Sequence, residues 1–132
     1  MSRVIALDHG EARCGVAVSD PTGELVTPLA SVERPDTRRG LAAIAEVVRE
    51  RGAERVVVGL PLTLAGQEGT QAHAARAFAE RLSGVLDVPV ELYDERLTTR
   101  MADRGGGSAD ADSRAAAHLL ESWLTRTGSD RT

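Results

Sequence analysis

The sequence predicts an α/β protein with a mixed five-stranded sheet and helices on both of its faces. Near the N-terminus, three short apolar segments are separated by tight turns, which is typical of an antiparallel meander. Further along, apolar strand-like segments alternate with segments of helical periodicity, which is typical of parallel strands joined by crossover helices. The predicted order is therefore three strands, then helix, strand, helix, strand and helix.

The meander opens with a run of four apolar residues that ends in Asp8. Its second turn is Asp-Pro-Thr-Gly at residues 20–23, with proline and glycine at positions that β-turns favour. Pro28 interrupts the third strand, and we expect this strand at the sheet edge because proline cannot donate to a strand ladder. We assign the three strands to residues 4–8, 14–19 and 24–32.

The remaining strands and helices are marked by the spacing of their apolar residues. Leu41, Ile44 and Val48 share one helical face, and Gly52 is placed to end that helix. The β-branched run at residues 56–58 indicates a strand buried on both faces. We assign helices to residues 37–51, 71–86 and 110–126, strands to 55–61 and 89–93, and a short helix to 97–103.

A chain of 132 residues predicts a single domain, which we place at residues 1–126, followed by a flexible tail at 127–132. Hydrophobic residues make up 42% of the chain, enough for a core, whereas aromatic residues make up only 2% and offer little for stacking on bases. A single cysteine, Cys14, excludes an internal disulfide and a cysteine-based zinc site. No apolar run approaches the roughly 20 residues of a membrane span. We therefore expect a cytoplasmic protein with no membrane partner.

The net charge of −4 argues against a protein that coats nucleic acid through bulk electrostatics. All 16 basic residues are arginines, whose guanidinium groups suit phosphates. Genome composition explains a lysine-free, alanine-rich chain equally well. Composition thus leaves local phosphate contacts open and excludes only a broadly basic surface.

Three acidic residues are predicted to meet at one edge of the sheet. The carboxyl ends of parallel strands share an edge, so Asp8 and Glu95, which end the first and fifth strands, lie together there. Asp112 lies one helical turn before Ala116, on the inner face of the last helix, and so faces the sheet. Each acid also has an ordinary alternative role: a turn cap for Asp8, a helix N-terminal charge for Asp112 and an ion pair for Glu95.

Three carboxylates at one edge repel each other unless a cation lies among them. Oxygen-only ligands suit Mg²⁺ or Mn²⁺, and two such ions about 3.5–4 Å apart can activate water and stabilise the leaving oxygen of a phosphodiester. The set therefore predicts hydrolysis of a nucleic-acid backbone with two ions. Asp8, Glu95 and Asp112 would be both the metal ligands and the catalytic residues, with Asp8 bridging the ions.

Motifs spread over nearly the whole chain resemble those of one family. They include Leu-Asp-His-Gly at residues 7–10, Arg-Cys-Gly-Val-Ala-Val-Ser-Asp at 13–20, Val-Gly-Leu-Pro-Leu at 58–62, and Asp-Glu-Arg-Leu-Thr-Thr at 94–99, with Asp112 beyond them. Together they resemble the YqgF family, also called RuvX, of the RuvC-like, ribonuclease H-like superfamily. The resemblance implies a ribonuclease H-like fold and a metal-dependent nuclease with the same three catalytic acids. It also implies a role in 5′-end processing of pre-16S ribosomal RNA, with precursor RNA and ribosomal particles as partners.

Two features depart from the pattern of the family. His9 stands where the family usually has tyrosine. It could protonate a leaving group, but we expect a surface histidine in a turn. Between Thr99 and Asp112, relatives carry a longer helix and a basic loop, whereas this chain is short and glycine-rich at 104–109. The shorter loop removes positive charge that would help to bind RNA phosphates. It also affects where Asp112 is placed relative to Asp8 and Glu95.

Four residues are predicted to bind substrate: Arg13, Arg96, Thr98 and Thr99. Arg13 follows the first turn and could contact a phosphate of the scissile strand or simply be solvated. The other three follow Glu95 directly. Either threonine could cap a helix, and a helix N-terminus at that place could also bind phosphate.

Other functions stay open from the sequence. The acidic net charge and the shortened loop favour a non-catalytic RNA- or ribosome-associated factor. A DNA nuclease of the Holliday junction resolvase type would need a dimer to place two sites, and the sequence is compatible with a monomer or a dimer. Actin-like ATPases share the Asp-x-Gly opening seen at residues 8–10, but 132 residues are too few for their two lobes.

Overall fold

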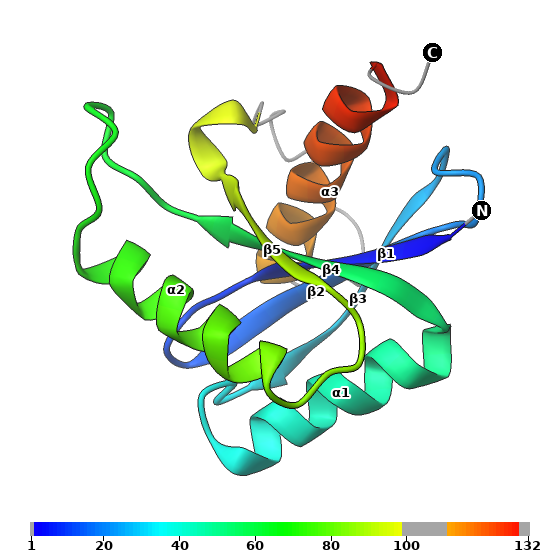
Figure 1. The fold of residues 1–132 in the computed structure, drawn as a ribbon, viewed down its shortest axis with the longest axis horizontal. Helices are drawn as coiled ribbons and strands as arrows, with labels where there is room; N and C mark the ends of the chain where they lie inside the picture. The colour runs from blue at the N-terminus through cyan, green and yellow to red at the C-terminus, as the bar shows by residue number, and fades with distance from the viewer. Residues whose placement is uncertain (1, 99–110, 130–132) are drawn as a thin grey trace.

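The computed structural model describes residues 2–98 and 111–129, which follow the predicted order of strands and helices (Figure 1). The elements are β1 (Arg3–Asp8), β2 (Arg13–Ser19), β3 (Val26–Glu33), α1 (Arg38–Arg51), β4 (Ala53–Leu60), α2 (Thr70–Ser83), β5 (Val90–Asp94), the 3-10 helix η1 (Glu95–Leu97) and α3 (Ala111–Ser129).

The five strands form one sheet in the order β3-β2-β1-β4-β5. Strand β2 is antiparallel to both β1 and β3, whereas β1, β4 and β5 are parallel. The prediction of a mixed sheet is confirmed, and β3, which contains Pro28, is an edge strand as expected. The carboxyl ends of β1, β4 and β5 therefore lie together at one end of the strands. We call this end of the sheet the carboxyl edge.

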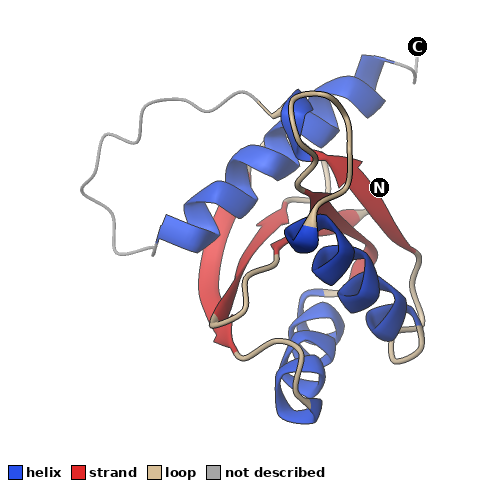
Figure 2. Cartoon of the chain, turned by 90° about the vertical axis from the view of Figure 1, so that its left-hand side faces the viewer, coloured by secondary structure: helices blue, strands red, loops and turns tan. Residues whose placement is uncertain are grey.

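Different helices cover the two faces of the sheet (Figure 2). Ile5 and Leu7 of β1 belong to the core under α1 and α2, whereas Val4 and Ala6 belong to the core under α3. Because successive side chains of a strand alternate between faces, Asp8 follows Val4 and Ala6 to the α3 face. The prediction of helices on both faces is confirmed, and the face that matters for the acids is the one under α3.

Helix α1 shows how local sequence sets the ends of these elements. Thr37 caps its N-terminus by accepting a hydrogen bond from the Gly40 amide at 3.0 Å. Gly52 ends it in the left-handed conformation, with φ of 64°, as its position in the sequence predicts. Between these caps, the apolar face predicted from Leu41, Ile44 and Val48 is buried.

The short helix predicted at residues 97–103 does not begin at Leu97. A single 3-10 turn, η1, begins at Glu95 instead, because the Asp94 side chain accepts a hydrogen bond from the Arg96 amide at 2.9 Å. Thr98 then returns to extended backbone and ends the turn. Residues 99–103 lie outside the described part of the chain.

Helix α3 is longer than the sequence predicted. Residues 127–129 were expected to belong to a flexible tail, but the helix continues to Ser129. The Thr127 hydroxyl donates to the Trp123 carbonyl at 2.8 Å, which lets a polar residue continue the helix. Residues 130–132 lie outside the described part.

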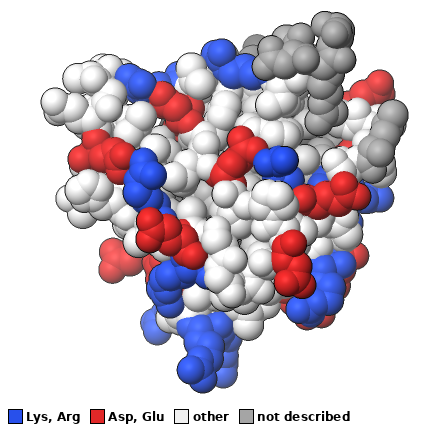
Figure 3. Space-filling view, viewed as in Figure 1, with Lys and Arg blue, Asp and Glu red and all other residues white. Residues whose placement is uncertain are grey.

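In the view of Figure 3, acidic and basic side chains are scattered next to one another on a largely uncharged surface. On this face, the described residues therefore do not form the continuous basic patch by which many proteins hold nucleic acid through bulk charge. Among the described residues, none of the helices has the length and apolar character needed to cross a bilayer.

Candidate active site

Asp8 lies at the end of β1 between glycines of the two neighbouring strands. Gly15 of β2 is its partner in the antiparallel pairing. Leu7 pairs with Val58 of β4, so Gly59 is the next residue beside Asp8 on the other side. Neighbouring positions across strands point to the same face, so positions 8, 15 and 59 all face α3. The two glycines leave room on both sides of the Asp8 carboxylate.

The room at Gly15 is filled by the first turn of α3. A Cβ at position 15 would clash with the main-chain carbonyl of Asp112 and would lie 2.8 Å from the Ser113 nitrogen. Ser113 is fully buried, and its hydroxyl accepts a hydrogen bond from the Val16 amide at 3.1 Å. The backbone of α3 therefore rests directly on β2, which brings Asp112 to the neighbouring strand of Asp8.

The room at Gly59 is filled by the side chain of Glu95. A Cβ at position 59 would lie 2.9 Å from both Cγ and Oε1 of Glu95. Gly59 pairs with Tyr93 of β5, so the chain turns back over β4 directly after the strand ends at Asp94. The Glu95 side chain therefore stands over β4, the strand next to Asp8.

The structure thus places all three predicted acids at the carboxyl edge, on the α3 face. Asp8 is central, Asp112 stands over β2 and Glu95 over β4. Among the described residues, however, no three acidic, histidine or cysteine side chains are grouped closely enough to hold one metal ion. The three side chains are all carboxylates, which is the ligand chemistry that a divalent ion such as Mg²⁺ prefers.

Arg13, a predicted substrate-binding residue, lies beside the acids at the start of β2. Its Nε is 3.8 Å from Oδ2 of Asp112. The two side chains are 56% and 43% exposed, so solvent screens this ion pair and it contributes little to stability. The guanidinium group is therefore available to exchange the carboxylate for another anion at small cost.

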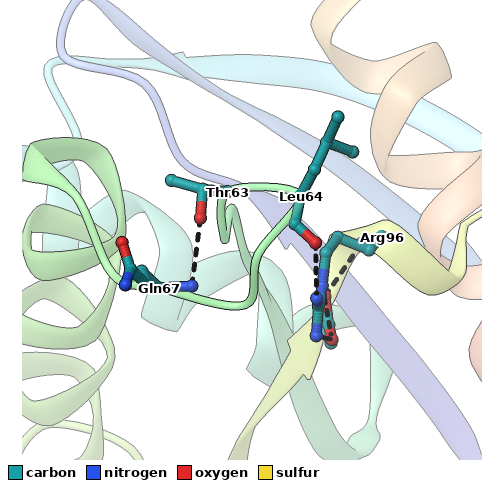
Figure 4. A network of polar contacts seen from close by, with 5 residues as sticks. Thr63, Leu64, Gln67 and Arg96 are labelled. Carbon is teal, nitrogen blue, oxygen red and sulfur yellow. Dashed lines mark hydrogen bonds and ion pairs between the residues drawn. The ribbon is translucent and has the colours of Figure 1, made fainter.

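Arg96 is engaged within the protein. Its Nε and Nη2 donate to the Asp94 carboxylate at 2.7–3.1 Å, and its Nη1 donates to the Leu64 carbonyl at 3.3 Å (Figure 4). Hydrogen bonding from the Arg96 side chain is the largest cause that lowers the pKa of Asp94 below its ordinary value. Arg96 therefore joins the start of η1 to the loop between β4 and α2.

Of the two threonines that were predicted to bind substrate, the structure describes only Thr98. The hydroxyl oxygen of Thr98 is buried and has no hydrogen-bond partner within the part of the chain that the structure describes. In this conformation it does not face solvent, where a substrate would meet it. Thr99 lies outside the described residues, as does the glycine-rich segment at 104–109.

Comparison with known proteins decides the family. Residues 2–126 match the family model RuvX, which is described as "Holliday junction resolvase". The chain belongs to the RuvX family. A relative from Chloroflexus aurantiacus is 42% identical over 130 residues, covering 92% of this chain and 85% of the relative. One from Anaeromyxobacter dehalogenans is 43% identical over 133 residues, covering 94% and 97%. Both relatives carry the name "Putative pre-16S rRNA nuclease".

Solved structures confirm the fold of this RuvX family member. RuvC of Thermus thermophilus, in complex with a Holliday junction substrate, superposes with a TM-score of 0.60 over 97% of each chain. The sequences are 18% identical, so the likeness shows a shared ribonuclease H-like fold and no more. The fold that the motifs implied is therefore confirmed.

His9 is a residue whose role the sequence did not reveal. It was expected at the surface of a turn, but its side chain is only 6% exposed. Its Nε2 lies 2.9 Å from Oδ2 of Asp36, and its ring packs against Phe78 with centroids 4.6 Å apart. In this RuvX family member, His9 thus anchors the turn that directly follows Asp8. Asp36 lies 27 residues away, so no local signal could have shown the contact.

Cys14 is buried beneath the site, as the sequence predicted for a small core residue. Burial raises the pKa of its thiol, and the negative charges of Asp8, Asp36 and Asp112 raise it further. A thiol held in this way stays protonated and is a poor nucleophile or metal ligand. The candidate ligands at this edge are therefore the carboxylates and not the thiol.

Proposed function

We propose that this protein is a metal-dependent nuclease that hydrolyses phosphodiester bonds during 5′-end processing of pre-16S ribosomal RNA. The observation that carries the proposal is the glycine-flanked Asp8, with Glu95 on one side and Asp112 on the other. The names of relatives at 42% and 43% identity support the choice of substrate. Precursor RNA and ribosomal particles are the proposed partners, and the cytoplasm is the proposed location.

In the proposed mechanism, Asp8 is held in a fixed position because its strand is paired on both sides. Glu95 and Asp112 would complete the ligand set from the two flanks. When bound, Mg²⁺ or Mn²⁺ supplies Lewis acidity and lowers the pKa of a coordinated water. Arg13, whose Nε lies 3.8 Å from Oδ2 of Asp112, would exchange this carboxylate for a substrate phosphate and hold the scissile strand against the acids.

Replacement of Asp8 by asparagine tests the proposal. We expect Asp8→Asn to lose cleavage of a 16S-precursor RNA in Mg²⁺ or Mn²⁺ by well over about 100-fold, since even outer-shell changes at metal sites cost 10–100-fold. Asp87→Asn is the matched control, because Asp87 is an exposed acid in the turn before β5. Equal cleavage by wild type and Asp8→Asn would mean that any activity is contamination and that the mechanism is wrong.

A second candidate function is a non-catalytic RNA- or ribosome-associated factor. One observation favours it: no three potential ligands in the described chain are grouped around a single point. This function predicts RNA binding that needs no divalent ion and is unchanged in Asp8→Asn. Four-way DNA belongs in the same assays, because the family model carries a resolvase description.

A further inference from the structure

The loop between β4 and α2 carries a large apolar side chain at its tip. Leu64 is 96% exposed, more than any other large hydrophobic residue in the described chain. The remaining exposed members of this group are Leu25, Val85 and Leu97. A scattered exposed leucine is ordinary in itself, so the setting of Leu64 decides whether it matters.

The loop that carries Leu64 is tightly structured. Leu62 and Glu68 form an antiparallel bridge at its base. Above the bridge, the Thr63 amide donates to the Gln67 carbonyl at 2.9 Å, and the Gln67 amide donates to the Thr63 hydroxyl at 3.0 Å (Figure 4). The Gly66 amide closes the turn by donating to the Thr63 carbonyl at 2.8 Å. The exposure of Leu64 is therefore built into an ordered turn.

Two arginines from outside the loop hold it in place. Arg76 of α2 makes two hydrogen bonds to the Glu68 carboxylate, at 2.6 and 3.1 Å. Arg96 donates to the Leu64 carbonyl, and its guanidinium group lies against Gly66, where a Cβ would be 3.2 Å from Nη1. Since Arg96 directly follows Glu95 in the chain, the tip is tied to the element that delivers Glu95.

The loop stands at the same edge of the sheet as the acids. It begins where β4 ends at Leu60, and β4 is parallel to β1, which ends at Asp8. In Figure 1 the loop extends beyond the sheet on the side where η1 lies. A polymer bound along the carboxyl edge would therefore pass Leu64.

The apolar tip suits a nucleic-acid base better than a protein surface. A stable protein interface buries about 800 Å² on each partner, far more than one leucine provides. Apolar side chains that project from a rigid support are used to insert between bases. The aromatic residues of this chain are otherwise engaged: Phe78 and Trp123 are buried, and the Tyr93 hydroxyl is hydrogen-bonded to Ser122.

We propose that Leu64 packs against an unstacked base of a nucleic acid bound at the carboxyl edge, and that Arg96 fixes the distance from this contact to Glu95. The inference rests on the proposed function in taking nucleic acid as the ligand. It also narrows the substrate class, because an unpaired base offers its face to Leu64 without the unstacking cost that a continuous duplex would impose. The substrate has unpaired nucleotides beside the cleaved bond.

The experiment compares Leu64→Ala with Leu25→Ala in the full chain. Leu25 is also exposed, at 68%, but it lies in the turn between β2 and β3, at the opposite edge of the sheet. The probes are a single-stranded RNA with 2-aminopurine at successive positions and the fully paired duplex of the same sequence, with Ca²⁺ in place of Mg²⁺. We expect Leu64→Ala to weaken single-strand binding about tenfold, because the apolar area buried against the base is lost, and to remove one 2-aminopurine signal.

In the same experiment we expect Leu64→Ala to keep the duplex binding and the thermal midpoint of unfolding of wild type. We expect Leu25→Ala to match wild type throughout. Leu64→Phe should restore binding. The inference would be overturned if Leu64→Ala bound the single strand as well as wild type, or if it lost as much binding to the duplex as to the single strand. It would also be overturned if Leu25→Ala lost as much binding as Leu64→Ala, or if wild type bound no RNA. A loss seen only with ribosomal particles would overturn it in favour of a protein partner.

The inference and the proposed function can fail separately. If wild type binds the single strand through Leu64 but does not cleave it in Mg²⁺ or Mn²⁺, the nuclease proposal fails and the base contact stands. If wild type cleaves and Leu64→Ala cleaves and binds equally well, the base contact fails and the nuclease proposal stands.

Discussion

The two flanks of Asp8 look alike in the sequence, since each is a glycine in a neighbouring strand, but they are filled in different ways. Gly15 makes room for backbone, namely the carbonyl of Asp112 in the first turn of α3. Gly59 makes room for a side chain, that of Glu95. A helix backbone cannot move without moving the helix, whereas a glutamate can change its rotamer. The Gly15 flank is therefore part of the fold, and the Gly59 flank is an adjustable part of the site.

The largest expected effect is a loss of stability caused by a substitution in the Gly15 flank. Gly15→Ala places a Cβ against the Asp112 carbonyl and forces α3 off the sheet, so we expect a loss of about 3 kcal/mol or more in unfolding free energy. Thermal unfolding would show this as a fall in Tm of about 10 °C. Gly84→Ala is the control, because its added Cβ would meet only ordinary contact at 3.5 Å. A wild-type Tm for Gly15→Ala would show that α3 does not rest on β2.

The next effect is on the Gly59 flank and concerns activity. Gly59→Ala should displace the Glu95 carboxylate and lower kcat/KM for metal-dependent cleavage about 100-fold, as a shift of about 1 Å in a catalytic group can do. Tm should change little, since a rotamer change relieves the contact. Gly69→Ala is the matched control, with no atom within 4 Å of the added Cβ. A stability loss as large as that of Gly15→Ala would remove the distinction between the flanks.

Ser113 offers a milder test of the Gly15 flank. Ser113→Ala leaves the buried amide of Val16 without its acceptor, which should cost about 1–3 kcal/mol. Urea unfolding with an unchanged m-value would measure it. Ser83→Ala, at an exposed position in α2, should be neutral. If both variants unfold at the same urea concentration, the hydroxyl does not help to seat α3.

The smallest expected effect comes from loss of the Arg96–Asp94 pair, which lies next to Glu95 in the Gly59 flank. The pKa of Asp94 is lowered, first by its hydrogen bond from Arg96, so its contribution to stability is complete above the unfolded-state pKa of about 3.9. That contribution is lost as the pH falls through the lower folded-state value. Asp94→Asn should therefore be slightly less stable than wild type at pH 6, and the two should converge towards acid pH.

A second carboxylate separates stability from activity in this last test. The pKa of Asp20 is also lowered, first by the Thr22 hydroxyl, but Asp20 lies in the turn between β2 and β3. Asp20→Asn should show a similar pH profile of Tm with wild-type cleavage, whereas Asp94→Asn should slow cleavage a few-fold. Equal cleavage by both variants would show that the Arg96–Asp94 pair does not support Glu95.

The fold could be predicted because its signals are local. Alternating apolar residues, turn residues and helical spacing lie within short windows, and they led to the observed sheet order. The errors arose where a side chain bonds the backbone nearby: Asp94 starts η1 early, and Thr127 continues α3. Such bonds compete with ordinary propensities and leave no periodic pattern.

The site could be predicted only in part. The shared edge of Asp8 and Glu95 follows from parallel strands, and the structure agrees. The partners of Gly15, Gly59 and His9 could not be foreseen, because each pairs with a residue distant in the chain. The sequence marks the glycines as small but says nothing about what occupies the space.

The bond between Val16 and Ser113 spans 97 residues. Loop-closure entropy disfavours such a contact until the strands between are folded, so we expect α3 to dock late. During synthesis, β1 to β5 emerge before Asp112 exists in the chain. If the proposed function holds, the growing polypeptide lacks its third acid and cannot cut RNA on the ribosome that makes it. On that proposal, nuclease activity would begin only when the last helix closes the fold.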